Sequence, residues 1–342
     1  VRVPPPLLSP PLSRAACHRL RMGREVVLPS TRPVSARACW AAYAAALAAL
    51  ALVFVAKPSG SMYVTGLVAH VTSTSVIYLF SFLCSNSSIY DPAWCVFPIS
   101  LVIAWMATAP EPPSSRSWYG LAAFIGWFVR YNIFWPWDGW SVGLRTEDWR
   151  YGKIAEVTGS GTALYWLVSL TSLHQTPTLL VWFALAASYD VWTAGAAAAP
   201  PLGMWDGLAA LTLLMGILIE ASADSDLYRF RRFAYGPSAD LMTATGSKRI
   251  CRDGLWAYSR HPNYFGECLF WTGIALLGIA GELGERPLYS RWGGAAGMLA
   301  FFRVSASLMD ERLLANRGPE YREVIRDTSA LVPMPRFRWP WA

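Results

Sequence analysis

Charged residues are scarce in this chain. Lys, Arg, Asp and Glu together make up 15% of the 342 residues, against roughly 25% in ordinary soluble domains. Hydrophobic residues reach 54%, and 18 of the residues are tryptophan. This balance excludes a soluble globular fold and is typical of a polytopic membrane protein.

Motifs for metals, disulfides and nucleic acids are also missing. The six cysteines contain no C-x-x-C pair and the four histidines are dispersed, so we expect no structural metal and no disulfide framework. No G-x-G-x-x-G follows a strand, which excludes a Rossmann fold for any nucleotide. Residues 1–39 hold seven arginines and one acid, and so carry six of the seven net positive charges. The rest of the chain has no basic face for nucleic acid.

Apolar runs long enough to cross a bilayer, about 17 to 25 residues each, are frequent instead. They lie near residues 40–56, 63–83, 94–109, 118–135, 160–189, 204–221, 264–281 and 292–308. The run at 160–189 is long enough for a helical hairpin. We therefore predict an all-α fold, a polytopic helical bundle of about seven to nine transmembrane helices, in which residues 40–342 form a single membrane domain.

The N-terminal tail, residues 1–39, is rich in Arg and Pro. An Arg-rich, Ser-bearing, acid-poor N-terminus resembles an organelle transit peptide. A disordered cytosolic tail that obeys the positive-inside rule explains the same composition. We expect an integral membrane protein of the endoplasmic reticulum or a plastid, surrounded by membrane lipids. Further basic clusters at 229–252 and 303–326 are expected on the same cytosolic or stromal side.

The chemically richest stretch is Ser-Arg-His-Pro-Asn-Tyr-Phe-Gly-Glu, residues 259–267. Ionisable residues are costly at the edge of a bilayer and therefore mark functional sites. Proline suits a first helical turn, so Pro262 predicts a helix that begins near His261. Asn263 and Glu267 are four residues apart and are then expected on one face of this helix.

A plain structural explanation of the same stretch is an interfacial anchor. Arg260 would then extend its charge to the headgroups, and Tyr264 would belong to the aromatic belt. An anchor does not account for His261, Asn263 and Glu267 occurring together. We therefore favour a site that handles a cofactor and protons.

A second candidate is the stripe formed by Glu220, Asp224 and Arg231. Spacings of four and seven residues place all three side chains on one face of a continuous helix. An exposed cytosolic helix end would carry the same residue types. Glu220, however, lies where the sequence is still apolar, and a carboxylate there needs a partner.

A third candidate is the basic group Lys248, Arg249 and Arg252. Clustered cations suit the phosphates of a dinucleotide, including an additional 2′-phosphate. Anionic lipid headgroups would attract them equally well. These three residues alone therefore do not distinguish a dinucleotide site from a lipid-headgroup site.

Residues 253–267, which read Asp-Gly-Leu-Trp-Ala-Tyr-Ser-Arg-His-Pro-Asn-Tyr-Phe-Gly-Glu, resemble the signature of the steroid 5-alpha-reductase superfamily, in particular its uncharacterised branch of reductase-like membrane proteins. The resemblance extends over about 85–340. Supporting matches are Tyr90-Asp91-Pro92, Glu147-Asp148-Trp149-Arg150-Tyr151, Pro319-Glu320-Tyr321 and the segment 328–333. It implies a bundle of about seven helices that encloses NADPH from the cytosolic side and has a lipid-accessible cavity for an enone.

The resemblance also implies roles for individual residues. Asn263 and Glu267 match an Asn-x-x-Gly-Glu element that contacts the cofactor, and Glu220 stands where the true steroid reductases have Asn. The family's acid pair for the substrate carbonyl has no match, so the resemblance does not carry steroid specificity. The predicted cofactor-binding residues, within a reductase-like part at 200–342, are Glu220, Asp224, Arg231, Arg249, Arg260, Asn263 and Glu267.

The reaction that the resemblance implies is hydride transfer from NADPH to the β-carbon of a conjugated C=C–C=O in a lipid-soluble substrate, such as a sterol or a fatty acyl chain. Negative charge develops on the carbonyl oxygen, so an acidic donor is needed. Tyr264 and His261 are the candidate catalytic residues. The alternative is an S-adenosylmethionine-dependent membrane methyltransferase of the isoprenylcysteine or phospholipid type, which has a similar Arg-His-Pro-x-Tyr element. A non-enzymatic membrane scaffold is the third possibility.

Overall fold

The structure is a computed structural model that describes residues 34–138, 147–235, 250–284 and 287–336. Regular structure within these ranges is helical, and they contain no strand beyond two isolated bridges. The predicted all-α fold is therefore confirmed. The tail predicted at 1–39 lies almost wholly outside the described residues.

The helices follow one another with short connections. The first group comprises α2 (Ala36–Ala56), α3 (Met62–Cys84), the 3₁₀ turn η1 (Ser87–Tyr90), α4 (Ala93–Thr108) and α5 (Ser115–Asp138). The second comprises α7 (Trp149–Thr158), α8 (Ala163–Val168), the π-helical η2 (Ser169–Gln175), α9 (Thr176–Ala186) and α10 (Tyr189–Thr193). The third comprises α11 (Met204–Tyr235), the 3₁₀ turn η3 (Gly254–Ala257), α12 (Pro262–Ala280), α13 (Leu288–Arg317) and α14 (Pro319–Asp327).

Four helical segments of the described chain are long and apolar enough to cross a membrane: Ala36–Ala56, Met62–Cys84, Ser87–Thr108 and Met204–Phe230. They support an integral membrane protein, but the predicted count of seven to nine spans is not confirmed. The helices α5, α12 and α13 are 24, 19 and 30 residues long. Charged side chains lower the mean hydropathy of α5 and α13, whereas α12 contains a single one, Glu267.

Residues 163–186 do not form the helical hairpin for which the run at 160–189 has room. The helices α8, η2 and α9 follow one another without a break, and the middle segment, Ser169–Gln175, is π-helical. A π segment widens the helix without reversing the chain. The long apolar run is therefore one continuous helix.

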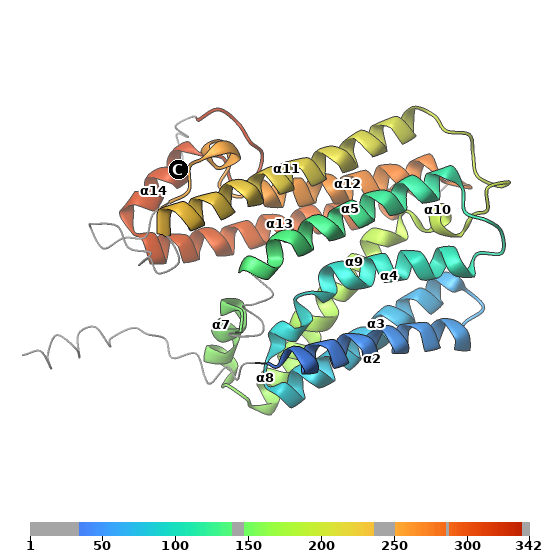
Figure 1. Cartoon of the computed structure of the whole chain (residues 1–342), viewed down its shortest axis with the longest axis horizontal. Helices are drawn as coiled ribbons and strands as arrows, with labels where there is room; N and C mark the ends of the chain where they lie inside the picture. The colour runs from blue at the N-terminus through green and yellow to red at the C-terminus, as the bar shows by residue number, and fades with distance from the viewer. Residues whose placement is uncertain (1–33, 139–146, 236–249, 285–286, 337–342) are drawn as a thin grey trace, which may run out of the picture.

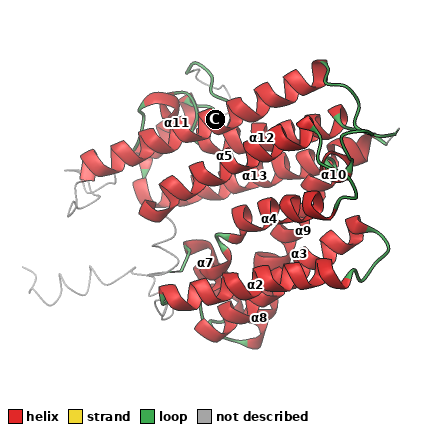
Figure 2. Cartoon of the chain, turned by 45° about the vertical axis from the view of Figure 1, so that its right-hand side comes forward, coloured by secondary structure: helices red, strands yellow, loops and turns green. Residues whose placement is uncertain are grey.

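The helices form two neighbouring groups, as Figures 1 and 2 show. Helices α5, α11, α12 and α13 lie side by side in one group, and α2, α3 and α8 lie in the other. Helices α4 and α9 lie between them and contact both. The helix α14 and the end of the described chain cover the same end of α11, α12 and α13.

An aromatic layer fixes α5 against α12. The rings of Trp127 and Phe270 stack with centroids 5.1 Å apart, and Phe124 meets Phe270 edge-on at 5.3 Å. These side chains are almost completely buried. Stacked and edge-on rings stabilise beyond their buried area, so this layer sets which residues of α5 face α12 in the next turn.

Helices α11 and α12 approach closely because glycines face each other. A Cβ atom on Gly216 would lie 2.8 Å from the backbone nitrogen of Phe270, and one on Gly266 would lie 2.8 Å from the carbonyl oxygen of Gly216. The same Cβ on Gly266 would overlap the side chain of Glu220. Glycine at position 266 is therefore what lets Glu220 lie directly against α12.

Candidate functional site

A buried ion cluster lies where α5, α11 and α12 meet. The guanidinium of Arg130, from α5, contacts the carboxyls of Glu220, Asp224 and Glu267. Its Nη1 is 3.0 Å from Asp224 Oδ2 and its Nη2 is 3.2 Å from Glu267 Oε1, while Nη2 also pairs with Glu220. The indole nitrogen of Trp127 donates to the same Glu267 oxygen at 3.2 Å. We call Arg130 and its three acidic partners the Arg130 cluster.

Within the described part of the chain, the Arg130 cluster contains more acid than base. Three carboxyls share one guanidinium, and Glu220 is fully buried while Asp224 and Glu267 are 19% and 14% exposed. Uncompensated charge is expensive away from water. The cluster therefore has room for protons or for hydrogen-bond donors brought by a ligand.

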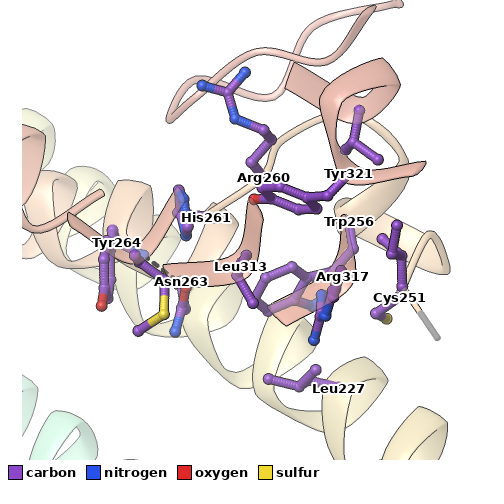
Figure 3. A pocket seen from close by; sticks show the side chains of 13 residues that line it. Leu227, Cys251, Trp256, Arg260, His261, Asn263, Tyr264, Leu313, Arg317 and Tyr321 are labelled. Atoms are coloured by element: carbon purple, nitrogen blue, oxygen red, sulfur yellow. Dashed lines mark hydrogen bonds between the residues drawn. The ribbon is translucent and has the colours of Figure 1, made fainter. Parts of the chain in front are cut away.

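A cavity of about 170 Å³ lies beside the first turn of α12. Its walls come from four helices, α11, α12, α13 and α14, and from the loop before α12. Figure 3 shows the side chains that line it. The polar and aromatic residues of the lining are Cys251, Trp256, Arg260, His261, Asn263, Tyr264, Arg317 and Tyr321. Aliphatic side chains and Met309 complete it.

Helix α12 begins as its sequence predicts. Pro262 is the first helical residue and His261 is the N-cap. Asn263 lines the cavity, and Glu267, one turn later, belongs to the Arg130 cluster. The first two turns of α12 thus join the cavity to the cluster.

The loop before α12 is fixed to a segment near the end of the chain. Donors from residues 259–261 reach the carbonyl oxygens of residues 329–331: Arg260 N to Ser329 O at 2.8 Å, His261 N to Ala330 O at 3.1 Å, and Ser259 Oγ to Leu331 O at 2.6 Å. These bonds satisfy backbone groups that would otherwise need water. The position of the cavity's polar wall therefore depends on both segments.

Asp310 of α13 is the centre of a second network. Its carboxylate accepts from Arg260 Nη2 at 2.9 Å, His261 Nε2 at 2.9 Å and the hydroxyl of Tyr321 at 2.6 Å. Arg260 also donates through Nη1 to the carbonyls of Ile325 and Thr328. We call Arg260, His261, Asp310 and Tyr321 the Asp310 network.

The Asp310 network changes the acidity of its members. Burial by itself raises the pKa of Asp310, but the hydrogen bonds from His261, Arg260 and Tyr321 and the charge of His261 outweigh burial and lower this pKa to about 2. Burial and the neighbouring Asp310 raise the pKa of Tyr321. Asp310 is therefore a carboxylate at any ordinary pH.

Arg260 faces away from the cavity's other polar residues. In Figure 3 its guanidinium points away from Asn263 and Tyr264, and each of its three nitrogens donates to Asp310 or to a backbone carbonyl. This geometry gives Arg260 an anchoring role. Its predicted contact with a cofactor stays a prediction.

Tyr264 and His261 lie together at the cavity wall. Their rings stack with centroids 5.4 Å apart and an angle of 17°, and Phe302 supports the other side of Tyr264 at 5.5 Å. His261 uses Nε2 toward Asp310. The hydroxyl of Tyr264 makes no hydrogen bond to the described part of the chain.

The predicted site residues thus fall into two adjoining groups. Glu220, Asp224 and Glu267 belong to the Arg130 cluster, whereas the polar residues of the stretch 260–264 line the cavity. Arg231 lies on α11, but its side chain is outside the description, and Arg249 precedes the described residue Ile250.

Three residues of these networks were not among the predicted ligands: Arg130, Asp310 and Tyr321. The signal for Arg130 was present, since an arginine inside the apolar run 118–135 requires an acidic partner by the same reasoning that singled out Glu220. Asp310 and Tyr321 lie among many charged residues, near the end of α13 and in the amphipathic α14. Tyr321 belongs to the match Pro319-Glu320-Tyr321, which gave it no role in the site, and nothing local distinguishes Asp310.

Most of the chain is similar to proteins of one family. Residues 77–328 match a family model described as a protein of unknown function, DUF1295. This match covers well over half of the chain. The protein belongs to the DUF1295 family. It is also similar to the uncharacterized protein C594.04c of Schizosaccharomyces pombe, with 25% identity over 279 residues, which is 76% of each chain. The matched range contains the whole Arg130 cluster and the whole Asp310 network.

Proposed function

We propose that this protein is an NADPH-dependent membrane reductase that acts on a C=C bond conjugated to a carbonyl in a lipid-soluble substrate. The proposal rests on the likeness of residues 253–267 to the steroid 5-alpha-reductase superfamily. The observation that carries it is the position of two of these residues on successive turns of α12, with Asn263 in the cavity wall and Glu267 in the Arg130 cluster. We also expect the protein in the membrane of the endoplasmic reticulum or of a plastid.

The size of the cavity fits one end of a dinucleotide. At about 170 Å³ it is smaller than the roughly 300–1,000 Å³ of sites that enclose a whole ligand. Its lining offers an amide from Asn263, a cation from Arg317 and aromatic rings from Trp256 and Tyr321. This mixture of stacking surfaces, hydrogen-bonding groups and positive charge suits a nicotinamide or adenine nucleotide.

Asn263 and Glu267 would hold the uncharged polar groups of the cofactor. A carboxylate accepts hydrogen bonds and repels phosphate, so Glu267 suits a carboxamide N–H or a ribose hydroxyl. Asn263 both donates and accepts. Phosphates are better served by Arg317 at the cavity and, from the sequence, by Arg231 and Arg249. When bound, NADPH supplies the hydride.

Tyr264 is the proton donor that we assign to the substrate carbonyl. His261 and Phe302 hold its ring from two sides, and its hydroxyl makes no hydrogen bond within the described residues. His261, the other candidate, has its Nε2 committed to Asp310. A donor held in a water-poor site stabilises the charge that develops on the carbonyl oxygen.

Ligand binding tests this proposal directly. The protein purified in detergent is titrated with NADPH and, separately, with S-adenosylmethionine, and each titration is repeated with Glu267→Gln. We expect the wild type to bind NADPH and Glu267→Gln to bind it at least tenfold more weakly. Binding of S-adenosylmethionine with no binding of NADPH would instead support a methyltransferase. Binding of neither would support a scaffold.

The role of Tyr264 is tested by turnover. With NADPH and a panel of lipid enones in vesicles, Tyr264→Phe is expected to lower the rate of NADPH oxidation by about 100-fold or more while NADPH binding stays intact. Tyr258→Phe is the matched control, since Tyr258 is 49% exposed and lies outside the cavity. Equal rates for Tyr264→Phe and Tyr258→Phe would exclude Tyr264 as the donor.

A further inference from the structure

Arg130 holds together three residues that were predicted to bind the cofactor. It forms an ion pair with each of Glu220, Asp224 and Glu267. Its side chain is 8% exposed, and it lies on α5, which contributes no residue to the cavity. It belongs to none of the motifs that the sequence offers.

We propose that Arg130 is the positioning residue of the cofactor site, acting through Glu267. This inference rests on the proposed function, because the ligand of Glu267 is taken to be NADPH. Neither Arg130 nor Glu267 lines the cavity, but Glu267 follows Asn263 of the cavity wall by one helical turn. Arg130 fixes the direction of the Glu267 carboxylate.

The geometry around Glu267 supports this role. Arg130 Nη2 and Trp127 Nε1 both reach Glu267 Oε1, each at 3.2 Å. Two donors from successive turns of α5 therefore converge on one oxygen. A carboxylate fixed through one oxygen presents the rest of its acceptor capacity in a defined direction.

The planar guanidinium is needed for this arrangement. Nη1 forms an ion pair with Asp224, and Nη2 forms ion pairs with Glu220 and Glu267. The planar guanidinium of arginine can hydrogen-bond carboxylates on two helices at once, whereas the single ammonium of lysine is a point charge on a flexible side chain. A lysine would keep the charge of the cluster and lose the alignment.

If Arg130 only stabilised the fold, replacing it would affect NADPH binding no more than replacing another buried arginine of α5. Arg116 is such a residue. Arg116 is also buried, and its guanidinium pairs with Asp206 at 2.6 and 2.8 Å and with two backbone carbonyls. It lies 14 residues earlier on the same helix, or roughly 21 Å along the axis. Arg116 contacts neither the cavity nor the Arg130 cluster.

The experiment compares Arg130→Lys with Arg116→Lys in the full-length protein in detergent. For each variant the melting temperature and the dissociation constant of NADPH are measured. Both variants are expected to lower the melting temperature. Arg130→Lys alone is expected to raise the dissociation constant, by about tenfold or more, and Arg116→Lys is expected to leave it within about twofold of the wild type.

Two outcomes overturn the inference. Either Arg130→Lys binds NADPH as tightly as the wild type does, or Arg116→Lys weakens binding as much as Arg130→Lys does. If Arg130→Lys does not fold, the double variant Arg130→Gln/Glu220→Gln takes its place, because it keeps the formal charge of the cluster. Wild-type affinity in that variant also refutes positioning. A wild-type protein that binds no NADPH refutes the proposed function itself.

Discussion

Two buried charge networks lie on either side of the first turn of α12, and they are built in opposite ways. In the Asp310 network one carboxylate accepts from three side chains, those of Arg260, His261 and Tyr321. In the Arg130 cluster one guanidinium serves three carboxyls. The first network has donors in excess and the second has acceptors in excess.

The two networks therefore differ in what they can do: the first holds segments of the chain together, and the second can accept hydrogen bonds from a ligand. The Asp310 network joins the loop before α12 to α13 and to the segment after α14, and Arg260 completes its bonding with backbone carbonyls. The carboxylate of Asp310 and the guanidinium of Arg260 are thus hydrogen-bonded within the protein. Glu267 of the Arg130 cluster follows Asn263 of the cavity wall by one turn of α12. Under the proposed function, Glu267 of the acid-rich cluster binds the ligand, and the Asp310 network holds the wall of the cavity in place.

The largest effect is expected from removing the charge of Asp310. Asp310→Asn leaves the buried guanidinium of Arg260 without a carboxylate among its described partners, and breaking a buried ion pair typically costs about 3–5 kcal/mol. The free energy of unfolding, measured by denaturant titration in detergent, is expected to fall by that amount. Asp327→Asn is the control, because the Arg252–Asp327 pair is 3.5 Å long and about one-third exposed. It is expected to cost about 1 kcal/mol or less.

Acid is expected to weaken the same network. The pKa of Asp310 is about 2 in the folded protein, below the ordinary value of about 3.9. A lowered pKa in the folded state stabilises the fold above the unfolded value, and this contribution is lost as the pH falls from about 4 to about 2. This contribution amounts to about 2–3 kcal/mol. Stability measured over this pH range should decline more steeply in the wild type than in Asp310→Asn; parallel declines would contradict the assignment.

A smaller effect is expected from separating α11 and α12. A Cβ atom at position 266 would collide with Glu220 and lie 2.8 Å from the carbonyl oxygen of Gly216, so Gly266→Ala forces the helices apart. We expect a loss of about 1–2 kcal/mol in unfolding free energy and weaker NADPH binding. Gly60→Ala serves as the control, since a Cβ atom at position 60 would meet nothing within 4 Å. Similar losses in both variants would rule out close packing as the cause.

The smallest loss of unfolding free energy is expected for Glu220→Gln. This variant tests directly whether the Arg130 cluster has an excess of acid. Glu220→Gln leaves Arg130 with Asp224 and Glu267, so no buried charge loses its last partner. The unfolding free energy is expected to change by less than about 1 kcal/mol. A loss as large as that of Asp310→Asn would show that the cluster has no excess of acid.

Local sequence rules predicted the parts of the site that lie on one helix. Pro262 fixed the start of α12, and the four-residue spacing of Glu220 and Asp224 correctly placed both on one face of α11. These predictions depend on helical geometry alone. They need no knowledge of neighbouring helices.

The partners of these residues could not be predicted in the same way. Arg130 and Asp310 are 137 and 49 residues away from the groups they bond, Glu267 and His261. Their placement follows from helix packing, which depends on the aromatic layer and on glycines such as Gly266. The number of spans was not confirmed for a related reason, since charged residues that pair inside the bundle also interrupt apolar runs.

The attachment of residues 259–261 to residues 329–331 has a consequence for biosynthesis. Ser259 bonds to a carbonyl 72 residues later in the chain, so the ribosome must add α12, α13 and α14 before this wall of the cavity can take its shape. Membrane insertion of the earlier helices therefore precedes completion of the cavity. A nascent chain halted before residue 329 would already sit in the bilayer, yet it would lack a finished binding wall.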